Sequence, residues 1–153
     1  MAEEAVKWIK ASKDQPFFLN YWAFSVHGPW EGKPDYVKAF AADVDPDNPQ
    51  RHPVYAAMIK SMDEAVGRLL DTVDELGLRD DTVVVFTSDN GGVVKPAKKI
   101  ASIYEGLPVT SNAPLREGKG SIYEGGSRVP LIVSWPGEFK AASSTDAIFS
   151  SID

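Results

Sequence analysis

The spacing of apolar side chains along the chain predicts two amphipathic helices. In the first, Glu3–Ala11, the apolar residues Val6 and Ile9 lie on one helical face. The second, Val54–Leu76, is longer, and its apolar residues recur at intervals of three and four. These residues are Met58, Met62, Ala65, Val66, Leu69, Val73 and Leu76. Gly77 follows directly and suits the end of a helix, because glycine readily adopts the left-handed backbone conformation.

Continuous apolar runs bounded by turn residues predict three buried strands. They are Pro16–Phe24, Thr82–Thr87 and Val129–Trp135. Such runs, separated by a helix, are typical of parallel strands that helices cover on both faces, so the predicted fold class is α/β. The stretches Trp30–Pro53 and Gly91–Gly120 are rich in polar residues and proline and are expected to be loops.

Polar side chains follow the predicted strands at the points where a sheet of this class binds ligands. In open α/β sheets the ligand lies outside the carboxyl ends of the strands. His27 follows the first strand, and Asp89 and Asn90 follow the second. Lys119 lies in the loop that leads to the third strand. We therefore expect these four residues to converge at one edge of the sheet.

The sequence Asp89-Asn90-Gly91-Gly92 presents two oxygen donors side by side on a backbone that can bend away. Hard divalent cations such as calcium or magnesium prefer oxygen ligands of this kind. An ordinary turn is the alternative, and it is favoured for the four residues taken alone, because all of these residue types favour turns. A cation site also requires ligands from elsewhere, and no second acidic pair follows a predicted strand.

The other polar candidates are ambiguous when each is taken singly. His27 is either a loop histidine without a special role or a proton donor and anion contact, whereas His52 has no predicted role in chemistry. Lys119 lies between two glycines, which allows its ammonium to reach into a cleft. The phosphate-loop pattern GxxxxGK[ST] is absent. Glu124 and Arg128 are expected to pair within a turn and to have a structural role.

Composition narrows the class of protein. A chain of 153 residues suits one domain, and its net charge of -6 argues against nucleic acid as a partner. The absence of cysteine excludes disulfides, thiolate zinc sites and a cysteine nucleophile. No apolar run is long enough to span a bilayer, and the first helix is unlike a signal peptide.

Three segments taken together resemble the type I sulfatases, the arylsulfatase-like branch of the alkaline phosphatase superfamily. They are PFFLNYWAFSVHGPW, YAAMIKSMDEAVGRLLDTVDELGLRDDTVVVFTSDNGG and LREGKGSIYEGGSRVPLIVSWPG. The resemblance covers nearly the whole chain and is most specific around Lys119. It implies that residues 1–153 are a partial catalytic domain, truncated at both ends, internal or C-terminal in position. The implied architecture is a partial alkaline-phosphatase-like α/β/α sandwich with a mostly parallel sheet.

The resemblance also implies a role for each matching residue. Asp89 and Asn90 would be two ligands of a calcium ion, or alternatively of magnesium. His27 would contact the sulfate ester and help to protonate the leaving oxygen, and Lys119 would bind the sulfate and the bridging oxygen. The implied substrate is an aryl or carbohydrate sulfate ester, and the family is usually periplasmic, secreted or lysosomal. The resemblance specifies no oligomeric state.

The chain departs from the family at the nucleophile, which is a formylglycine made from a cysteine or a serine. Without cysteine the Cys-x-Pro-x-Arg signature is absent. The serine version, Ser-x-Ala-x-Arg, is approached at Ser111-Asn112-Ala113, but Arg116 comes one residue too late. The family's Asp-Asp metal pair is also missing. We therefore expect half of a metal site, half of an anion pocket and no measurable sulfatase turnover by the chain alone.

Two alternatives remain open at the level of sequence. One is a non-catalytic or degenerate sulfatase-fold module, which the missing nucleophile favours. The other is a phosphatase or phosphodiesterase of the same superfamily. Those enzymes commonly carry histidine where this chain has Asn90, because imidazole suits zinc and an amide oxygen suits calcium. Asn90 therefore favours the sulfatase.

Overall fold

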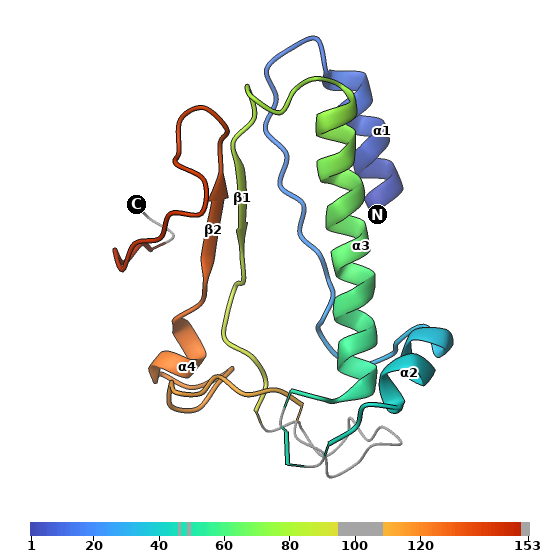
Figure 1. The fold of residues 1–153 in the computed structure, drawn as a ribbon, viewed down its shortest axis with the longest axis vertical. Helices are drawn as coiled ribbons and strands as arrows, with labels where there is room; N and C mark the ends of the chain where they lie inside the picture. The colour runs from blue at the N-terminus through green and yellow to red at the C-terminus, as the bar shows by residue number, and fades with distance from the viewer. Residues whose placement is uncertain (46, 49, 95–108, 151–153) are drawn as a thin grey trace.

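The computed structural model describes residues 1–45, 47–48, 50–94 and 109–150 and shows a mixed α/β arrangement (Figure 1). In chain order the elements are α1 (Ala2–Ser12), α2 (Pro34–Ala41), α3 (Pro53–Glu75), β1 (Val84–Thr87), α4 (Glu124–Ser127) and β2 (Leu131–Ser134). Helices α1 and α2 pack against α3, and β1 pairs with β2. The predicted α/β class is confirmed.

Helix α3 begins at a histidine cap. The Nδ1 atom of His52 accepts a hydrogen bond from the Tyr55 backbone N–H at 3.3 Å, and Pro53 occupies the first turn, where no N–H is needed. His52 is buried and makes an edge contact with the Trp30 ring. Burial lowers the pKa of His52, which favours the neutral imidazole that can accept this bond. The second histidine of the chain thus has a structural role.

The other end of α3 is closed by the predicted glycine. Gly77 has a φ of +68°, and its N–H donates to the Asp74 carbonyl at 3.0 Å. The N–H of Leu78 reaches back to the Val73 carbonyl, also at 3.0 Å. This pair of bonds is a Schellman motif, which satisfies carbonyls that the helix itself leaves unpaired. Both predicted helices are confirmed to within two residues at each end.

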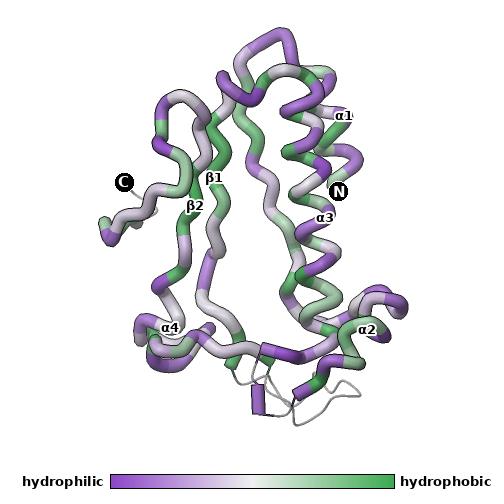
Figure 2. Tube along the Cα trace, in the orientation of Figure 1, coloured by the Kyte–Doolittle hydropathy of each residue, from purple (hydrophilic) through white to green (hydrophobic). Residues whose placement is uncertain are grey.

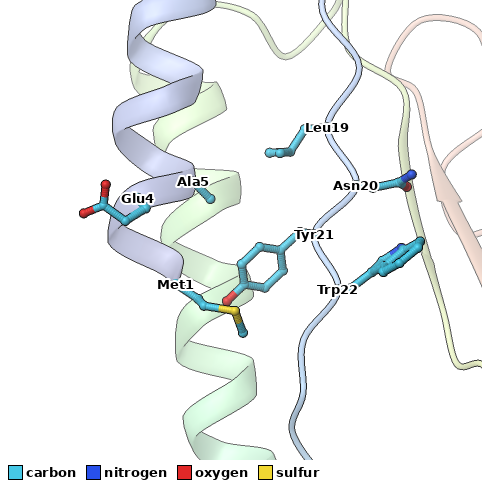
Figure 3. A pocket seen from close by; sticks show the side chains of 7 residues that line it. All are labelled: Met1, Glu4, Ala5, Leu19, Asn20, Tyr21 and Trp22. Atoms are coloured by element: carbon cyan, nitrogen blue, oxygen red, sulfur yellow. The ribbon is translucent and has the colours of Figure 1, made fainter.

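The segment predicted as the first strand, Pro16–Phe24, is extended but pairs with no strand in the described part of the chain. Its side chains still alternate: Leu19 and Tyr21 point toward the helices, whereas Asn20 and Trp22 point away (Figure 3). The outward-facing Trp22 is 82% exposed. The extended conformation was therefore predicted correctly, but strand pairing was not, because no strand in the described part of the chain pairs with this segment.

Strands β1 and β2 form an antiparallel pair, so the expectation of parallel strands is wrong for these two. Val84 lies opposite Ser134, and Thr87 lies opposite Leu131. Figure 1 shows that the chain leaves β1 at the lower end, passes through α4 there, and returns along β2. An apolar run indicates that both faces of a strand are apolar, but the direction of pairing depends on this connection.

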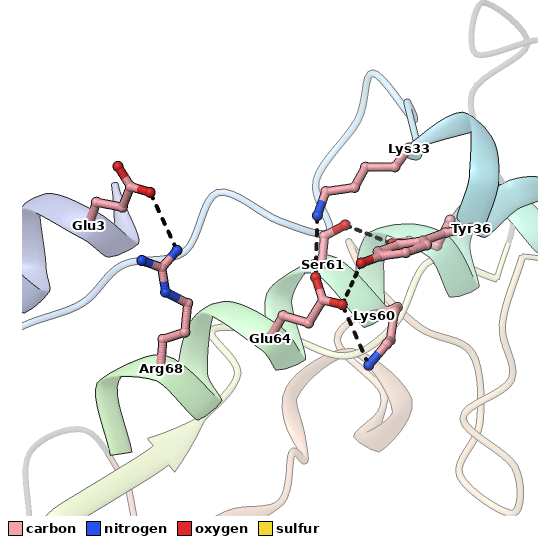
Figure 4. A network of polar contacts seen from close by, with 8 residues as sticks. Glu3, Lys33, Tyr36, Lys60, Ser61, Glu64 and Arg68 are labelled. Carbon is pink, nitrogen blue, oxygen red and sulfur yellow. Dashed lines mark hydrogen bonds and ion pairs between the residues drawn. The ribbon is translucent and has the colours of Figure 1, made fainter. Parts of the chain in front are cut away.

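Helix α2 lies within Trp30–Pro53, which was predicted to be a loop, and that prediction is wrong for its eight residues. Polar contacts join this region to α3 (Figure 4). The Tyr36 hydroxyl donates to Glu64, whose carboxylate also lies 3.2 Å from the Lys33 ammonium. The hydrogen bond from Tyr36 and the neighbouring lysines lower the pKa of Glu64. These contacts fix α2 on α3, although exposed ion pairs contribute little stability singly.

The buried core is small and lies mainly among the helices. Its apolar members are Ile9, Val54, Ala57, Met58, Val73 and Val109. The two-stranded sheet is apolar along its length (Figure 2), yet both of its faces are open, since the consecutive residues Val85 and Phe86 are 57% and 41% exposed. No helix in the described part of the chain is long and apolar enough to cross a membrane.

Candidate active site

The carboxyl end of β1 bends at Ser88-Asp89-Asn90, where two candidate cation ligands lie. The Ser88 hydroxyl donates to the Asn90 carbonyl at 2.8 Å and closes the bend. The Asn90 amide nitrogen donates to the Gly91 carbonyl at 3.0 Å, which directs the amide oxygen away from that carbonyl. Asp89 is exposed and Asn90 is half-buried. The bend therefore presents a carboxylate and an amide oxygen from adjacent residues.

This donor set fits part of a calcium site. Carboxylate and amide oxygens are typical calcium ligands, but the ion usually collects about six to eight of them. Within the described residues, no group of three or more His, Cys, Asp or Glu side chains could hold a metal ion. Asp89 and Asn90 thus suit a cation chemically and leave most of its coordination sphere to other groups.

Two backbone hydrogen bonds hold this bend against the loop that carries Lys119. The Gly91 N–H donates to the Gly126 carbonyl at 3.0 Å, and the Lys119 N–H donates to the Gly92 carbonyl at 3.0 Å. The backbone of Lys119 is therefore hydrogen-bonded to Gly92, which is three residues after Asp89, although Lys119 and Asp89 are 30 residues apart in sequence. The structure brings together the two segments that carry the predicted cation ligands and the predicted anion ligand.

Close backbone contacts explain the glycines at this junction. A Cβ atom added at Gly91 would lie 1.7 Å from the Gly125 carbonyl oxygen, and one added at Gly126 would lie 2.2 Å from the Ser121 carbonyl oxygen. Real Cβ atoms do not approach other atoms this closely, so only glycine fits. The sequence indicated a bend at Gly91-Gly92, but it did not show that a second backbone segment packs against it.

His27 is not joined to the other candidates by any contact that the structure describes. The backbone N–H of His27 donates to the Phe24 carbonyl at 3.0 Å. The Nδ1 atom of its ring lies 2.8 Å from the Gly28 carbonyl oxygen, and the side chain is exposed. The extended segment and β1 run in the same direction, so their carboxyl ends lie at the same end of the molecule (Figure 1). The extended segment thus ends at the same end of the molecule as β1, but none of the described contacts joins His27 to Gly92 or Lys119.

Two contacts between side chains lie close to Lys119 in the sequence, and both have a structural role. The Arg116 guanidinium lies 3.7 Å from the centre of the Tyr123 ring, a cation–π contact. Glu124 and Arg128 form the ion pair predicted for this turn, at 3.7 Å across α4. This single-turn helix was not predicted. Lys119 itself is exposed, as an ammonium that binds an external anion must be.

A hollow lies on the side of the extended segment that faces α1, and none of the predicted site residues lines it. It has a volume of about 600 Å³ and lies between α1 and that segment (Figure 3). Its lining consists of Met1, Glu4, Ala5, Leu19, Asn20, Tyr21 and Trp22. The shape of the surface alone therefore does not identify the site, which depends on the polar groups after β1.

Comparison with known proteins assigns the family. A family model described as Sulfatase matches residues 1–153, and the chain belongs to that family. It is 32% identical over 150 residues to the steryl-sulfatase of Homo sapiens, covering 98% of this chain and 23% of that protein. It is 31% identical over 153 residues to an N-acetylgalactosamine-6-O-sulfatase of Bacteroides thetaiotaomicron, covering 100% of this chain and 28% of that protein.

A solved structure matches the fold at a similar level. The structure of Ps i-CgsB in complex with k-i-k-neocarrahexaose superposes with a TM-score of 0.72 at 30% identity, covering 89% of this chain and 27% of that chain. The α/β fold implied by the resemblance to sulfatases is confirmed. Sulfatases generally act on sulfate esters and use a metal ion and a formylglycine. The chain spans only about a quarter of the curated relatives, 23% and 28% of their lengths.

Proposed function

We propose that this chain forms one part of a sulfatase active site and serves the hydrolysis of sulfate esters, with the nucleophile supplied from outside residues 1–153. The backbone hydrogen bond from Lys119 to Gly92 carries the proposal, because it joins a cation-binding bend to an anion-binding loop. A sulfate ester needs both, since its oxygens are negatively charged and more charge develops on the bridging oxygen as the bond breaks.

Each residue has a distinct part in this proposal. Asp89 and Asn90 would hold a calcium ion, or alternatively magnesium, which would supply Lewis-acid chemistry when bound. The Lys119 ammonium binds the sulfate and stabilises the negative charge that grows on the bridging oxygen. His27 donates a proton to the leaving oxygen.

The donor set also bears on the choice between sulfate and phosphate esters. The amide oxygen of Asn90 suits calcium, whereas phosphatases of the superfamily commonly place an imidazole at this point for zinc. The orientation of the Asn90 amide, with its nitrogen bonded to the Gly91 carbonyl, supports the role of an oxygen ligand. We propose aryl or carbohydrate sulfates as the substrate class, and two relatives bear names that specify a steryl and a sugar sulfatase.

The proposal is tested by restoring the rest of the domain. We expect a chimera, in which this chain replaces the aligned 28% of the Bacteroides thetaiotaomicron sulfatase, to release sulfate from a chromogenic aryl sulfate or from that enzyme's own substrate in a calcium-dependent reaction. The isolated chain is expected to release none. Free sulfate, measured by ion chromatography with and without a chelator, is the readout.

A folded chimera without sulfatase activity would contradict the proposal and favour a non-catalytic module. Circular dichroism and a single cooperative thermal transition establish folding independently of activity. Hydrolysis of a phosphate ester in preference to the sulfate ester would support the phosphatase alternative instead. Metal-dependent turnover by the isolated chain would show that the nucleophile lies within residues 1–153.

A further inference from the structure

Within the described residues, the side chain of Asn112 makes three hydrogen bonds at the junction between the two halves of the candidate site. Its amide oxygen accepts from the Gly92 N–H at 3.0 Å, and its amide nitrogen donates to the Gly92 carbonyl at 3.0 Å. The same nitrogen donates to the Glu117 carbonyl at 3.0 Å. The carboxamide therefore bonds to the N–H and the carbonyl of Gly92 and also to the carbonyl of Glu117 in the loop that carries Lys119. A flipped amide would face a donor with a donor and two acceptors with an acceptor, so its orientation is determined.

The Gly92 carbonyl oxygen links the segment that carries Asp89 and Asn90 to the loop that carries Lys119. It accepts one hydrogen bond from the Asn112 amide and another from the Lys119 N–H, each at 3.0 Å. A carbonyl oxygen has two lone pairs, and these two donors use both. The orientation of this carbonyl determines the position of the Lys119 backbone, and the hydrogen bond from the Asn112 amide stabilises that orientation.

Two glycines leave room for this arrangement and for little else. A Cβ atom at Gly118 would lie 2.3 Å from the Gly92 carbonyl oxygen and 2.6 Å from the Asn112 amide nitrogen. A Cβ atom at Gly92 would lie 3.1 Å from the Asn112 amide oxygen and 2.6 Å from the Thr110 methyl group. The half-buried carboxamide lies between two backbone segments, and its bonds to both require a side chain with one donor face and one acceptor face.

We propose that Asn112 is a positioning residue that sets the spacing between the Asp89–Asn90 cation ligands and the Lys119 ammonium. It touches neither substrate nor metal and acts through Gly92. This role rests on the proposed function, because it requires both halves to act on one sulfate ester. A displacement of about 1 Å at a catalytic group can cost about 100-fold in rate, so a loose junction would reduce turnover.

The substitution Asn112→Asp tests this role with almost no change in shape. Aspartate keeps the acceptor for the Gly92 N–H but loses the donor and places an oxygen against the Gly92 and Glu117 carbonyls. We expect hydrogen exchange at the Lys119 amide of the isolated chain to accelerate at least about tenfold, while exchange at Val73 in α3 is unchanged. NMR of the ¹⁵N-labelled chain measures both rates.

The same substitution in the chimera separates positioning from a general loss of structure. We expect kcat to fall about 10- to 100-fold, with the calcium concentration for half-maximal rate unchanged within about twofold. Asn48→Asp is the matched control, because it adds the same charge in a half-buried turn where the amide oxygen, which aspartate retains, accepts from the Gln50 N–H at 3.0 Å. The control should change neither exchange nor kcat.

Each outcome decides the proposal. Equal acceleration of exchange at Lys119 and Val73 would show that Asn112 supports the whole fold, and unchanged exchange at Lys119 would show that it does not hold this loop; either result overturns the proposal. If wild-type chimera is inactive, the proposed function fails, while exchange still reports whether Asn112 holds Lys119. If Asn112→Ala, which removes all three bonds, keeps full activity, the positioning role fails and the proposed function stands.

Discussion

Replacing Lys119 with methionine in the chimera is expected to lower kcat by about 100- to 1,000-fold. Methionine preserves the length and much of the volume of the side chain but removes the ammonium that stabilises charge on the bridging oxygen. Because this interaction is strongest in the transition state, the loss should appear mainly in kcat and less in KM. Steady-state rates of sulfate release at saturating calcium measure both constants.

The matched control for this substitution is Lys140→Met. Lys140 is exposed in the turn after β2, and the structure gives it no part in the junction. The Lys140→Met substitution removes the same charge as Lys119→Met, so it accounts for any effect of net charge on the binding of an anionic substrate. Equal losses for the two variants, or full activity with Lys119→Met, would contradict the assignment of Lys119.

Replacing Gly91 with alanine is expected to destabilise the chain by about 3 kcal/mol. The added methyl group would lie 1.7 Å from the Gly125 carbonyl oxygen, and the obstacle is backbone that cannot rotate away. The bend and the Lys119 loop must therefore separate, breaking the bond between the Gly91 N–H and the Gly126 carbonyl. Urea unfolding followed by circular dichroism measures the change in the free energy of unfolding.

Gly67→Ala provides the control within the same chain. Gly67 lies in α3, and apart from its chain neighbours and the backbone of its own helix nothing lies within 4 Å of the position that its Cβ would occupy. Because glycine is about 1 kcal/mol less favourable than alanine in a helix, this variant should be more stable than wild type. A loss of stability in both variants, or in neither, would show that the contact between Gly91 and Gly125 does not constrain the fold.

The sequence predicted the helices well because their signals are local. The apolar spacing of α3 continues over 23 residues, and Gly77 marks its end with a conformation that glycine adopts readily. The position of Asp89 and Asn90 in the bend that follows β1 was also predicted from local pattern, since a run of apolar residues ended at a turn. The role of each in binding a cation remains a prediction.

Features that depend on distant parts of the chain were not predicted. The antiparallel pairing of β1 and β2 joins residues more than 40 positions apart in the sequence, and apolar content does not encode its direction. Helix α2 is only eight residues long and lies in a stretch rich in proline and charge, which masked its pattern. Asn112 was predicted only as part of an incomplete serine motif, because its partners Gly92 and Glu117 become neighbours only after folding.

The most direct test of the account is a calcium titration of the ¹⁵N-labelled chain, followed by NMR. We expect the amide signals of Asp89, Asn90, Gly92 and Lys119 to shift together and to saturate at one calcium concentration. A dissociation constant of about 1 mM or weaker is expected, since the chain supplies too few ligands for tight binding. Shifts at Asp89 without shifts at Lys119, or saturation at an unrelated acidic surface, would contradict the claim that one site contains both.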